Sequence, residues 1–395
     1  MAAARARTAR PDSVDAAAEL LRAAALEEAA LLFRGSGSKL DWGAPPSSVD
    51  LVADSSDLNR ILAHDAADMT VAVEAGVPVA DLQNLLASTG QWLGVDPASA
   101  GPGATVGGLV ATADSGPRRL KYGAVRDLVI GMTVVLADGT VAHSGGRVIK
   151  NVAGYDLARL FTGSLGALGM IAEVIFRLHP RPIVSRTVKL QRGAEDAFPL
   201  SMEVCGGAIE PTAVEWGNGE LLVRIEGQPE PVDSQVTTML RRVGGTGAGV
   251  EVLDGAGEAE AWEGVRRHLD GKPGQTVVRA GTLPSRLPDV LKALRESAAG
   301  AGVEATMCSS VVLGIHTAVL SGGSAAEHAA CLDDWRGRLG SPTEASVSVR
   351  RRLEGLAEVA DLWGPPSSSV QLMRRVKQQF DPHDRCARGR FSPWF

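Results

Sequence analysis

Small residues fill twelve consecutive positions in the first half of this chain, at residues 97–108 (PASAGPGATVGG). Such a segment has too little apolar surface to build a core. Its backbone N–H groups and the hydroxyls of Ser99 and Thr105 can instead lie along an extended ligand that carries phosphate. No Gly-Lys-Ser/Thr follows, as in a Walker loop, and the strand–GxGxxG–helix order of a Rossmann fingerprint is missing. The segment therefore predicts a ligand-binding backbone outside these two nucleotide folds.

Two further glycine-rich stretches flank this segment. Residues 34–38 (RGSGS) follow a short apolar strand, and two glycines there allow close backbone approach and an anion-binding nest of N–H groups. Residues 150–157 (KNVAGYDL) precede residues 160–171 (LFTGSLGALGMI), where Gly166 and Gly169 bracket a turn that feeds a buried strand. Each stretch alone is typical of an ordinary turn, but three in this order favour one shared ligand site.

The apolar periodicity predicts an α+β chain in three parts. Residues 1–182 mix helices (15–32, the helix edge 55–69, the end of 70–90) with strands (49–54, the start of 70–90, 168–180) and an Asp-Gly hairpin (132–146). Pro180 and Pro182 mark a boundary. Residues 183–365 alternate strands (187–192, 213–227, 303–320, 345–355) with helices (233–243, 287–299, 325–339), which predicts a smaller domain made of an antiparallel sheet covered by helices. Residues 366–395 form a helix and a tail that return to the first part.

Charge and composition exclude several functions. The net charge of −6 gives no basis for a nucleic-acid partner. No run of about 18 apolar residues predicts a membrane span. The four cysteines lie far apart and the seven histidines show no ligand spacing, so we expect free thiols and no metal site. The basic N-terminus lacks the serines of a transit peptide, and we expect a cytoplasmic protein, alternatively one held at the inner face of the membrane through partner subunits.

The ordered motifs RGSGSKLDWG, EAGVPVADLQNLLASTGQWLGVDP, ATVGGLVATADSGPRRLKYGAVRDL and KNVAGYDLARLFTGSLGALGMIAEVIF carry a resemblance. Together they resemble the FAD-binding half of the vanillyl-alcohol-oxidase/p-cresol-methylhydroxylase family, and within it the family of glycolate oxidase FAD-binding subunits of bacteria. The resemblance covers about residues 10–182 and the last twenty residues. It implies that fold for the first part, with FAD as the cofactor.

The resemblance also implies the residues that contact FAD. The first loop would bind the pyrophosphate through Gly35, Ser36, Gly37 and Ser38. The second loop would continue that contact through Pro97, Gly101, Gly103, Ala104, Thr105, Gly107 and Gly108. Ala111, Ser115 and Gly116 would pass the ribityl chain and flavin ring, and Gly166, Leu168, Gly169 and Ile171 would meet the adenine–ribose side. Arg390 matches the cation of the family's C-terminal tail, although a proline of that tail is missing here.

Two departures from the family bear on the chemistry. Lys39 and Leu40 stand where some members attach the flavin to a histidine, so we expect non-covalent FAD. A histidine-rich metal motif that catalytic relatives carry in the second part is missing, so the catalytic residues stay unknown. The resemblance implies an FAD-dependent oxidoreductase acting on CH–OH groups: the flavin subunit of a glycolate (2-hydroxyacid) oxidase or dehydrogenase. Hydride would pass from the hydroxyacid to flavin, and electrons to an iron–sulfur subunit beside a histidine-motif flavoprotein subunit.

Three alternatives stay open at this stage. The chain could be a stand-alone FAD-linked oxidase of an alcohol or sugar acid. It could be a flavin subunit for structure or electron transfer without a substrate site. It could also be an interaction module whose FAD site has decayed.

Several other residues have both a functional and an ordinary interpretation. His316 lies in an apolar strand and is expected to be a hydrogen-bonded core histidine rather than a substrate base. His179 is expected at a strand end. Residues 350–352 (RRR) could grip a carboxylate, but a solvated strand edge is the favoured interpretation. Arg118, Arg119, Lys121 and Arg126 could balance phosphate charge or be surface charges. Trp42 is expected to pack rather than stack at a flavin entrance.

Overall fold

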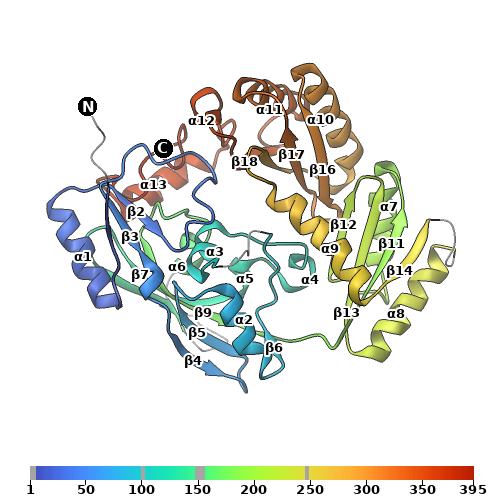
Figure 1. Ribbon diagram of the computed structural model, residues 1–395, viewed down its shortest axis with the longest axis horizontal. Helices are drawn as coiled ribbons and strands as arrows, with labels where there is room; N and C mark the ends of the chain where they lie inside the picture. Colours follow the sequence, from blue (N-terminus) through green and yellow to red (C-terminus); the bar gives the residue numbers. More distant parts are fainter. Residues whose placement is uncertain (1–5, 99–102, 147–155, 245–248) are drawn as a thin grey trace.

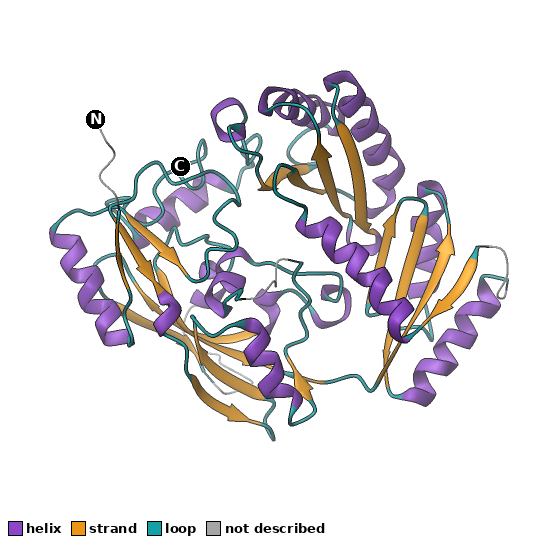
Figure 2. Cartoon of the chain, in the orientation of Figure 1, coloured by secondary structure: helices purple, strands orange, loops and turns teal. Residues whose placement is uncertain are grey.

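The computed structural model describes residues 6–98, 103–146, 156–244 and 249–395, and its α+β fold is the predicted class (Figures 1 and 2). A parallel sheet has the order β1-β3-β2, with β1 (Arg7–Ala9), β2 (Leu31–Arg34) and β3 (Leu51–Asp54). An antiparallel sheet has the order β4-β5-β9-β7-β8, with β4 (Ile61–Asp65), β5 (Thr70–Glu74), β7 (Val129–Val135), β8 (Val141–Gly145) and β9 (Met170–Arg177). A two-stranded sheet pairs β6 (Gln91–Trp92) with β10 (His179–Pro180).

Helices cover both of the larger sheets of this first part. The helices are α1 (Val14–Leu26), α2 (Val79–Ala87), α3 (Val106–Thr112), α4 (Arg119–Tyr122), α5 (Val125–Leu128) and α6 (Leu157–Phe161). The apolar face of α1, centred on Leu21, packs on β2, β3 and one end of β7 and β9. The apolar faces of α2 and α3 pack on β5, β7 and β9. This packing fixes the loops at the ends of β2 and α3 relative to each other.

Two local predictions in the first part were wrong. The helix expected over residues 15–32 ends at Leu26, because Glu28 adopts a left-handed conformation (φ 52°) that turns the chain into β2. The helix edge expected over residues 55–69 is a 3₁₀ turn, η1 (Ser55–Asp57), followed by β4. Pairing of β4 with β5 stabilises that strand, and a pairing partner is invisible in the local pattern.

The second part is an eight-stranded, fully antiparallel sheet in the order β14-β11-β13-β12-β16-β17-β15-β18. Its strands are β11 (Val184–Gln191), β12 (Ala213–Gly217), β13 (Glu220–Gly227), β14 (Val250–Leu253), β15 (Thr276–Gly281), β16 (Glu304–Ser310), β17 (Ile315–Ser321) and β18 (Ser346–Arg351). Its helices are α7 (Ala194–Cys205), α8 (Pro229–Arg242), α9 (Gly255–Asp270), α10 (Leu287–Ala301) and α11 (Ala325–Leu339), with short turns η2 (Pro284–Arg286) and η3 (Val311–Leu313). α7, α9, β14 and β15 were not predicted.

The two faces of this large sheet differ in chemistry. One face is apolar and packs on α7, α8, α10 and α11, with Trp335 fully buried in that core. Because side chains alternate along a strand, the residues between the core positions point to the opposite face. That face carries Glu226, Glu215, Ser310, Thr317 and Arg279 and is partly covered by α9. The polar face is turned toward the first part (Figure 1).

The chain ends beside its beginning. After α12 (Leu356–Val359), α13 (Val370–Phe380) and the C-terminal tail, residues 381–395, lie against the first part (Figure 1). Cys386 forms a parallel bridge with Leu31 at the start of β2. None of the helices in the described residues is long and apolar enough to cross a membrane.

Candidate functional site

Three loops and the C-terminal tail surround one pocket in the first part. β2 leads directly into the first loop, α3 begins inside the second, and the turn before β9 forms the third. The space between them is a groove that is partly open to solvent. Its lining residues are Phe33, Arg34, Gly35, Ser36, Gly37, Ser38, Lys39, Leu40, Ser55, Thr105, Gly107, Gly108, Ala111, Thr112, Leu165, Gly166, Gly169, Met170, Ile171 and Arg390.

Glycine at position 35, which has no side chain, lets the first two loops pack against each other. A Cβ at Gly35 would lie only 2.2 Å from Thr105 Oγ1, so no larger residue fits while Thr105 keeps its place. Thr105 is held there because its side chain caps α3 by accepting a hydrogen bond from the Gly108 N–H at 3.3 Å. Gly37 has φ 78°, which turns the first loop over the pocket. Gly35 is thus required by the packing of the two loops against each other, and Gly37 by the left-handed conformation of the backbone.

The structure brings together twelve of the residues predicted to contact a cofactor: Gly35, Ser36, Gly37, Ser38, Thr105, Gly107, Gly108, Ala111, Gly166, Gly169, Ile171 and Arg390. Six others are not among its lining residues: Pro97, Gly103, Ala104, Ser115, Gly116 and Leu168. Gly101 and most of the KNVAGYDL stretch are outside the described residues. For all of them, contact with FAD stays a prediction.

The six residues that do not line the pocket have different surroundings. Gly103 lies beside the first loop, where an added Cβ would be 3.8 Å from the Cβ of Ser36. Pro97 lines a second cavity, between α2 and α9. Ala104 and Leu168 are buried among other residues. Ser115 Oγ accepts the N–H of Val125 at 3.2 Å, and a Cβ at Gly116 would lie 1.9 Å from the Asp96 carbonyl oxygen.

Arg390 places a positive charge on the pocket wall. Its Nη1 donates to the carbonyl oxygens of Leu40 (3.1 Å), Trp42 (3.0 Å) and Ala44 (3.0 Å). Its Nε is buried and has no hydrogen-bond partner among the described residues. Burial and the charge of Arg352 lower the pKa of Arg390 to about 10, so it stays a cation at neutral pH. A buried cation with one unpartnered N–H beside open glycine backbone fits a phosphate-bearing cofactor such as FAD.

Two arginines on the polar sheet face, Arg279 and Arg350, do not line the pocket but lie within electrostatic range of Asp114. The Arg350 guanidinium is 5.1 Å from the centre of the Trp42 ring, and the Nε atoms of Arg279 and Arg350 are buried without a hydrogen-bond partner among the described residues. Burial and the charge of Arg279 lower the pKa of Arg350 to about 9. Burial also lowers the pKa of Arg279, partly offset by Asp114. The pocket-lining Lys39 lies 3.9 Å from Asp114, which links the arginines to the pocket.

The favoured interpretation of residues 350–352 as a solvated strand edge was wrong. β18 is an edge strand, but these arginines are turned toward the first part: Arg351 contacts Asp41 (3.3 Å) and Asp270 (3.2 Å), and Arg352 donates to the Gly43 carbonyl at 2.8 Å. Their role depends on packing between the two parts, which strand periodicity does not reveal. Arg279 was missed altogether. The sequence signal that could have indicated Arg279 is its position as the charged residue of the otherwise largely apolar run TVVRAG.

The basic residues near the second loop do not line the pocket. Arg118 makes a two-pronged ion pair with Glu226 of the second part (2.6 and 3.0 Å) and packs over Trp92. Burial raises the pKa of Asp96, beside Arg118, to about 6. Lys121 lies 3.9 Å from Glu210, and Arg126 is paired with its neighbour Asp127. These charges join the two parts or face solvent.

The histidine predictions are confirmed. His316 is fully buried, and both ring nitrogens are hydrogen-bonded, to Ser309 Oγ (2.8 Å) and Thr282 Oγ1 (2.9 Å). Burial lowers its pKa to about 4, so it is a neutral core residue. His179 ends the first part in β10. All four cysteines are free thiols, and across the described ranges no three His, Cys, Asp or Glu side chains are grouped to hold a metal ion.

The first part of the chain is similar to known FAD binding domains. Residues 6–145 match the family model described as an FAD binding domain, and this stretch contains the first two loops. The whole fold is similar to that of alkyldihydroxyacetonephosphate synthase, with a TM-score of 0.69 over 96% of this chain and 75% of the other. At 16% identity, that likeness concerns the fold alone.

Two curated relatives share sequence with part of the chain. Glycolate oxidase subunit GlcD of Bacillus subtilis is 35% identical over 217 residues, which cover 55% of this chain and 46% of the relative. Glycolate oxidase subunit GlcE of Escherichia coli is 32% identical over 219 residues, which cover 55% of this chain and 61% of the relative. The match thus spans about half the length of these relatives.

Proposed function

We propose that this chain is an FAD-dependent oxidoreductase that oxidises the CH–OH group of a small 2-hydroxyacid. The proposal is carried by the three-loop pocket of an FAD binding domain, together with two partly buried arginines, Arg279 and Arg350. Their Nε atoms are buried without a hydrogen-bond partner among the described residues. The two relatives named as glycolate oxidase subunits support the choice of a 2-hydroxyacid.

FAD is held without a covalent bond in this proposal. The pocket lining contains no histidine, cysteine or tyrosine within the described part of the chain, and the buried Lys39 follows the first loop. The open backbone of the first two loops and Arg390 hold the phosphates. When bound, FAD supplies the ring that accepts the two electrons of the oxidation.

Arg279 and Arg350 bind the carboxylate of the substrate. A guanidinium fork matches a carboxylate in geometry, and a buried arginine gains most from an anionic partner. The proximity of the two arginines, which lowers the pKa of Arg350, means that one substrate carboxylate relieves both charges. An uncharged alcohol would leave their buried Nε groups without an anionic partner, so the site favours an acid over an alcohol.

The chain acts as one subunit of a glycolate oxidase type of complex in this proposal. Subunit names of both relatives support this arrangement, as does the missing histidine-rich metal motif. The partners are a histidine-motif flavoprotein subunit and an iron–sulfur subunit that takes the electrons, in the cytoplasm or at the inner membrane face. A flavin subunit for electron transfer alone is the second candidate, and the same missing motif favours it.

Anaerobic mixing of the FAD-loaded chain with glycolate or D-lactate tests the proposal. Loss of the visible flavin absorption is expected for the wild type and for the control Arg295→Met, whose arginine is exposed on α10. Arg279→Met and Arg350→Met should raise the KM for the acid by at least about tenfold each. A flavin that is bleached only after partner subunits are added would support the electron-transfer candidate instead. Rapid reoxidation by oxygen would support an oxidase, and a colourless protein that takes up no FAD would refute the proposal.

A further inference from the structure

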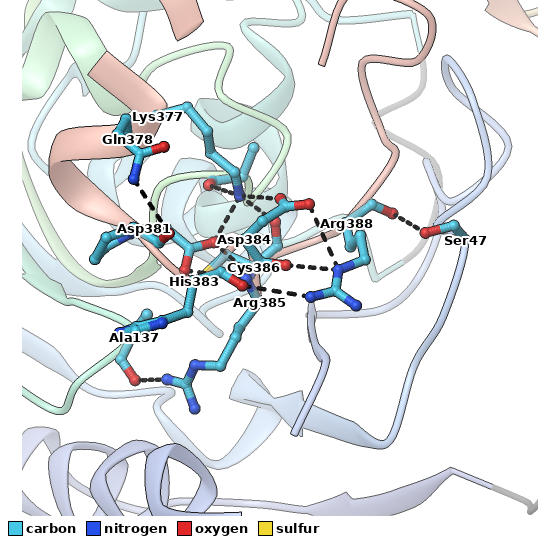
Figure 3. Close-up of polar contacts among 12 residues, drawn as sticks. Ser47, Ala137, Lys377, Gln378, Asp381, His383, Asp384, Arg385, Cys386 and Arg388 are labelled. Carbon is cyan, nitrogen blue, oxygen red and sulfur yellow. Dashed lines mark hydrogen bonds and ion pairs between the residues drawn. The ribbon is translucent and has the colours of Figure 1, made fainter. Parts of the chain in front are cut away.

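A buried lysine joins α13 and the C-terminal tail to the third loop. Lys377 lies on α13 and is 7% exposed. Its Nζ donates to Asp381 Oδ2 at 2.6 Å, to the Ala167 carbonyl oxygen at 2.9 Å and to the Cys386 carbonyl oxygen at 2.9 Å. Figure 3 shows the ammonium at the centre of these contacts, with Asp384 as a further ion-pair partner.

Two of these contacts reach the walls of the pocket. Ala167 belongs to the third loop, between Gly166 and Gly169, which both line the pocket. Cys386 belongs to the tail, where the neighbouring Ala387 N–H donates to the Leu31 carbonyl at 2.8 Å. Leu31 begins β2, which runs into the first loop. One ammonium therefore holds the third loop and the strand that presents the first loop in a fixed relation.

Asp381 completes the arrangement from the other side. Its Oδ1 accepts the Arg385 N–H at 3.0 Å, and its Oδ2 accepts the Cys386 N–H at 2.6 Å. Burial acts to raise the pKa of Asp381, but the hydrogen bond and charge of Lys377 and the backbone N–H groups together bring it below its ordinary value. The carboxylate is thus charged at neutral pH and shapes the turn that leads to Arg390, nine residues later.

A buried ion pair adds little to the stability of a core through packing alone. The desolvation of two charges offsets most of their attraction, and apolar residues of similar volume often stabilise a core equally well. The pair instead orients its partners, because the Ala167 carbonyl of the distant third loop and two acceptors of the C-terminal tail, Asp381 and Cys386, converge on one nitrogen. An apolar side chain at this position could fill the volume but could not orient the Ala167 carbonyl.

We infer that Lys377 is a positioning residue of the cofactor site, which fixes the third loop and the tail so that the pocket binds the adenosine-diphosphate half of FAD. This inference rests on the proposed function for the identity of the ligand. It adds a role for α13, which contributes no residue to the pocket lining within the described residues. The effect should fall on binding of the nucleotide and leave the oxidation step in the loaded protein unchanged.

The test compares apo-proteins in two titrations: FAD binding followed by flavin fluorescence, and ADP binding followed by competition. Lys377→Met should raise the Kd of both ligands by about tenfold or more, the size expected when an orienting partner is lost. Lys377→Met/Asp381→Asn removes the uncompensated carboxylate and should recover thermal stability while the Kd values stay raised. Lys377→Arg should recover part of the affinity, and the control Lys292→Met, exposed on α10, should match the wild type. FMN, which lacks the adenosine part, should bind wild type and variants alike.

Different failures are distinguishable. Kd values of Lys377→Met within about twofold of the control would overturn the inference while leaving FAD binding by the chain intact. Recovery of wild-type Kd values in the double variant would overturn it too, because the loss would then come from an unpaired buried charge. A wild type that binds neither FAD nor ADP would refute the proposed function and this inference together.

Discussion

Glu215 makes the chain lose stability as pH rises from about 4.5 to about 8. The residue lies on β12, is 1% exposed, and accepts hydrogen bonds from Ser310 Oγ and from Cys308 Sγ (3.6 Å). No lysine or arginine forms an ion pair with it within the described residues. Burial raises its pKa to about 8. The folded protein therefore keeps a proton that the unfolded chain releases near its ordinary pKa of 4.5.

The sign and size follow from proton linkage. A carboxyl whose pKa is raised on folding lowers stability as pH rises between the two pKa values. At 1.36 kcal/mol for each pKa unit, the interval from 4.5 to about 8 corresponds to about 5 kcal/mol. Glu215→Gln cannot ionise and keeps an oxygen to accept from Ser310. The variant should match the wild type within about 1 kcal/mol near pH 5 and exceed it by several kcal/mol above pH 8.

Urea unfolding of the apo-protein, followed by tryptophan fluorescence at several pH values, measures the effect. Trp216, the next residue on β12, is 3% exposed and reports on this region. The control Glu304→Gln, exposed at the start of β16, should follow the wild-type pH dependence. A stability difference between Glu215→Gln and the wild type that does not grow with pH would refute the reasoning.

Three further predictions concern the loops, the contact between the two parts and the core. Gly35→Ala should raise the Kd of FAD by at least about tenfold, because the new methyl group displaces Thr105. The control Gly264→Ala, in open space on α9, should leave that Kd unchanged. Equal Kd values for Gly35→Ala and the wild type in a fluorescence titration would contradict this prediction. Arg118→Ala should destabilise the chain by about 3–5 kcal/mol in urea unfolding, since it leaves a buried Glu226 unpaired, and a loss below about 1 kcal/mol would contradict the role of this ion pair. His316→Gln should lower the thermal midpoint but leave the pH profile of flavin reduction unchanged, and a shifted profile would show a catalytic role for His316.

The sequence alone determined the local features of the fold. The Asp-Gly turn predicted the hairpin of β7 and β8, and the amphipathic pattern of residues 325–339 predicted α11 with identical bounds. These features depend on interactions between near neighbours, so local residue preferences were sufficient. Three glycine-rich loops were also visible, because a run without side chains is conspicuous in any fold.

Only the tertiary structure decided what those loops enclose and what faces them. Gly35 contacts Thr105, which is seventy residues later in the sequence. Lys377 of α13 and Arg390 of the tail contact loops that precede them by more than two hundred positions. Residues 350–352 looked like a solvated edge, yet packing of the second sheet against the first part turned them toward residues 41–43 of the first part. Such contacts depend on how separate elements pack, and the periodicity of one strand does not indicate which element packs against it. The sequence thus determined the loops, and the tertiary structure decided which charges surround them.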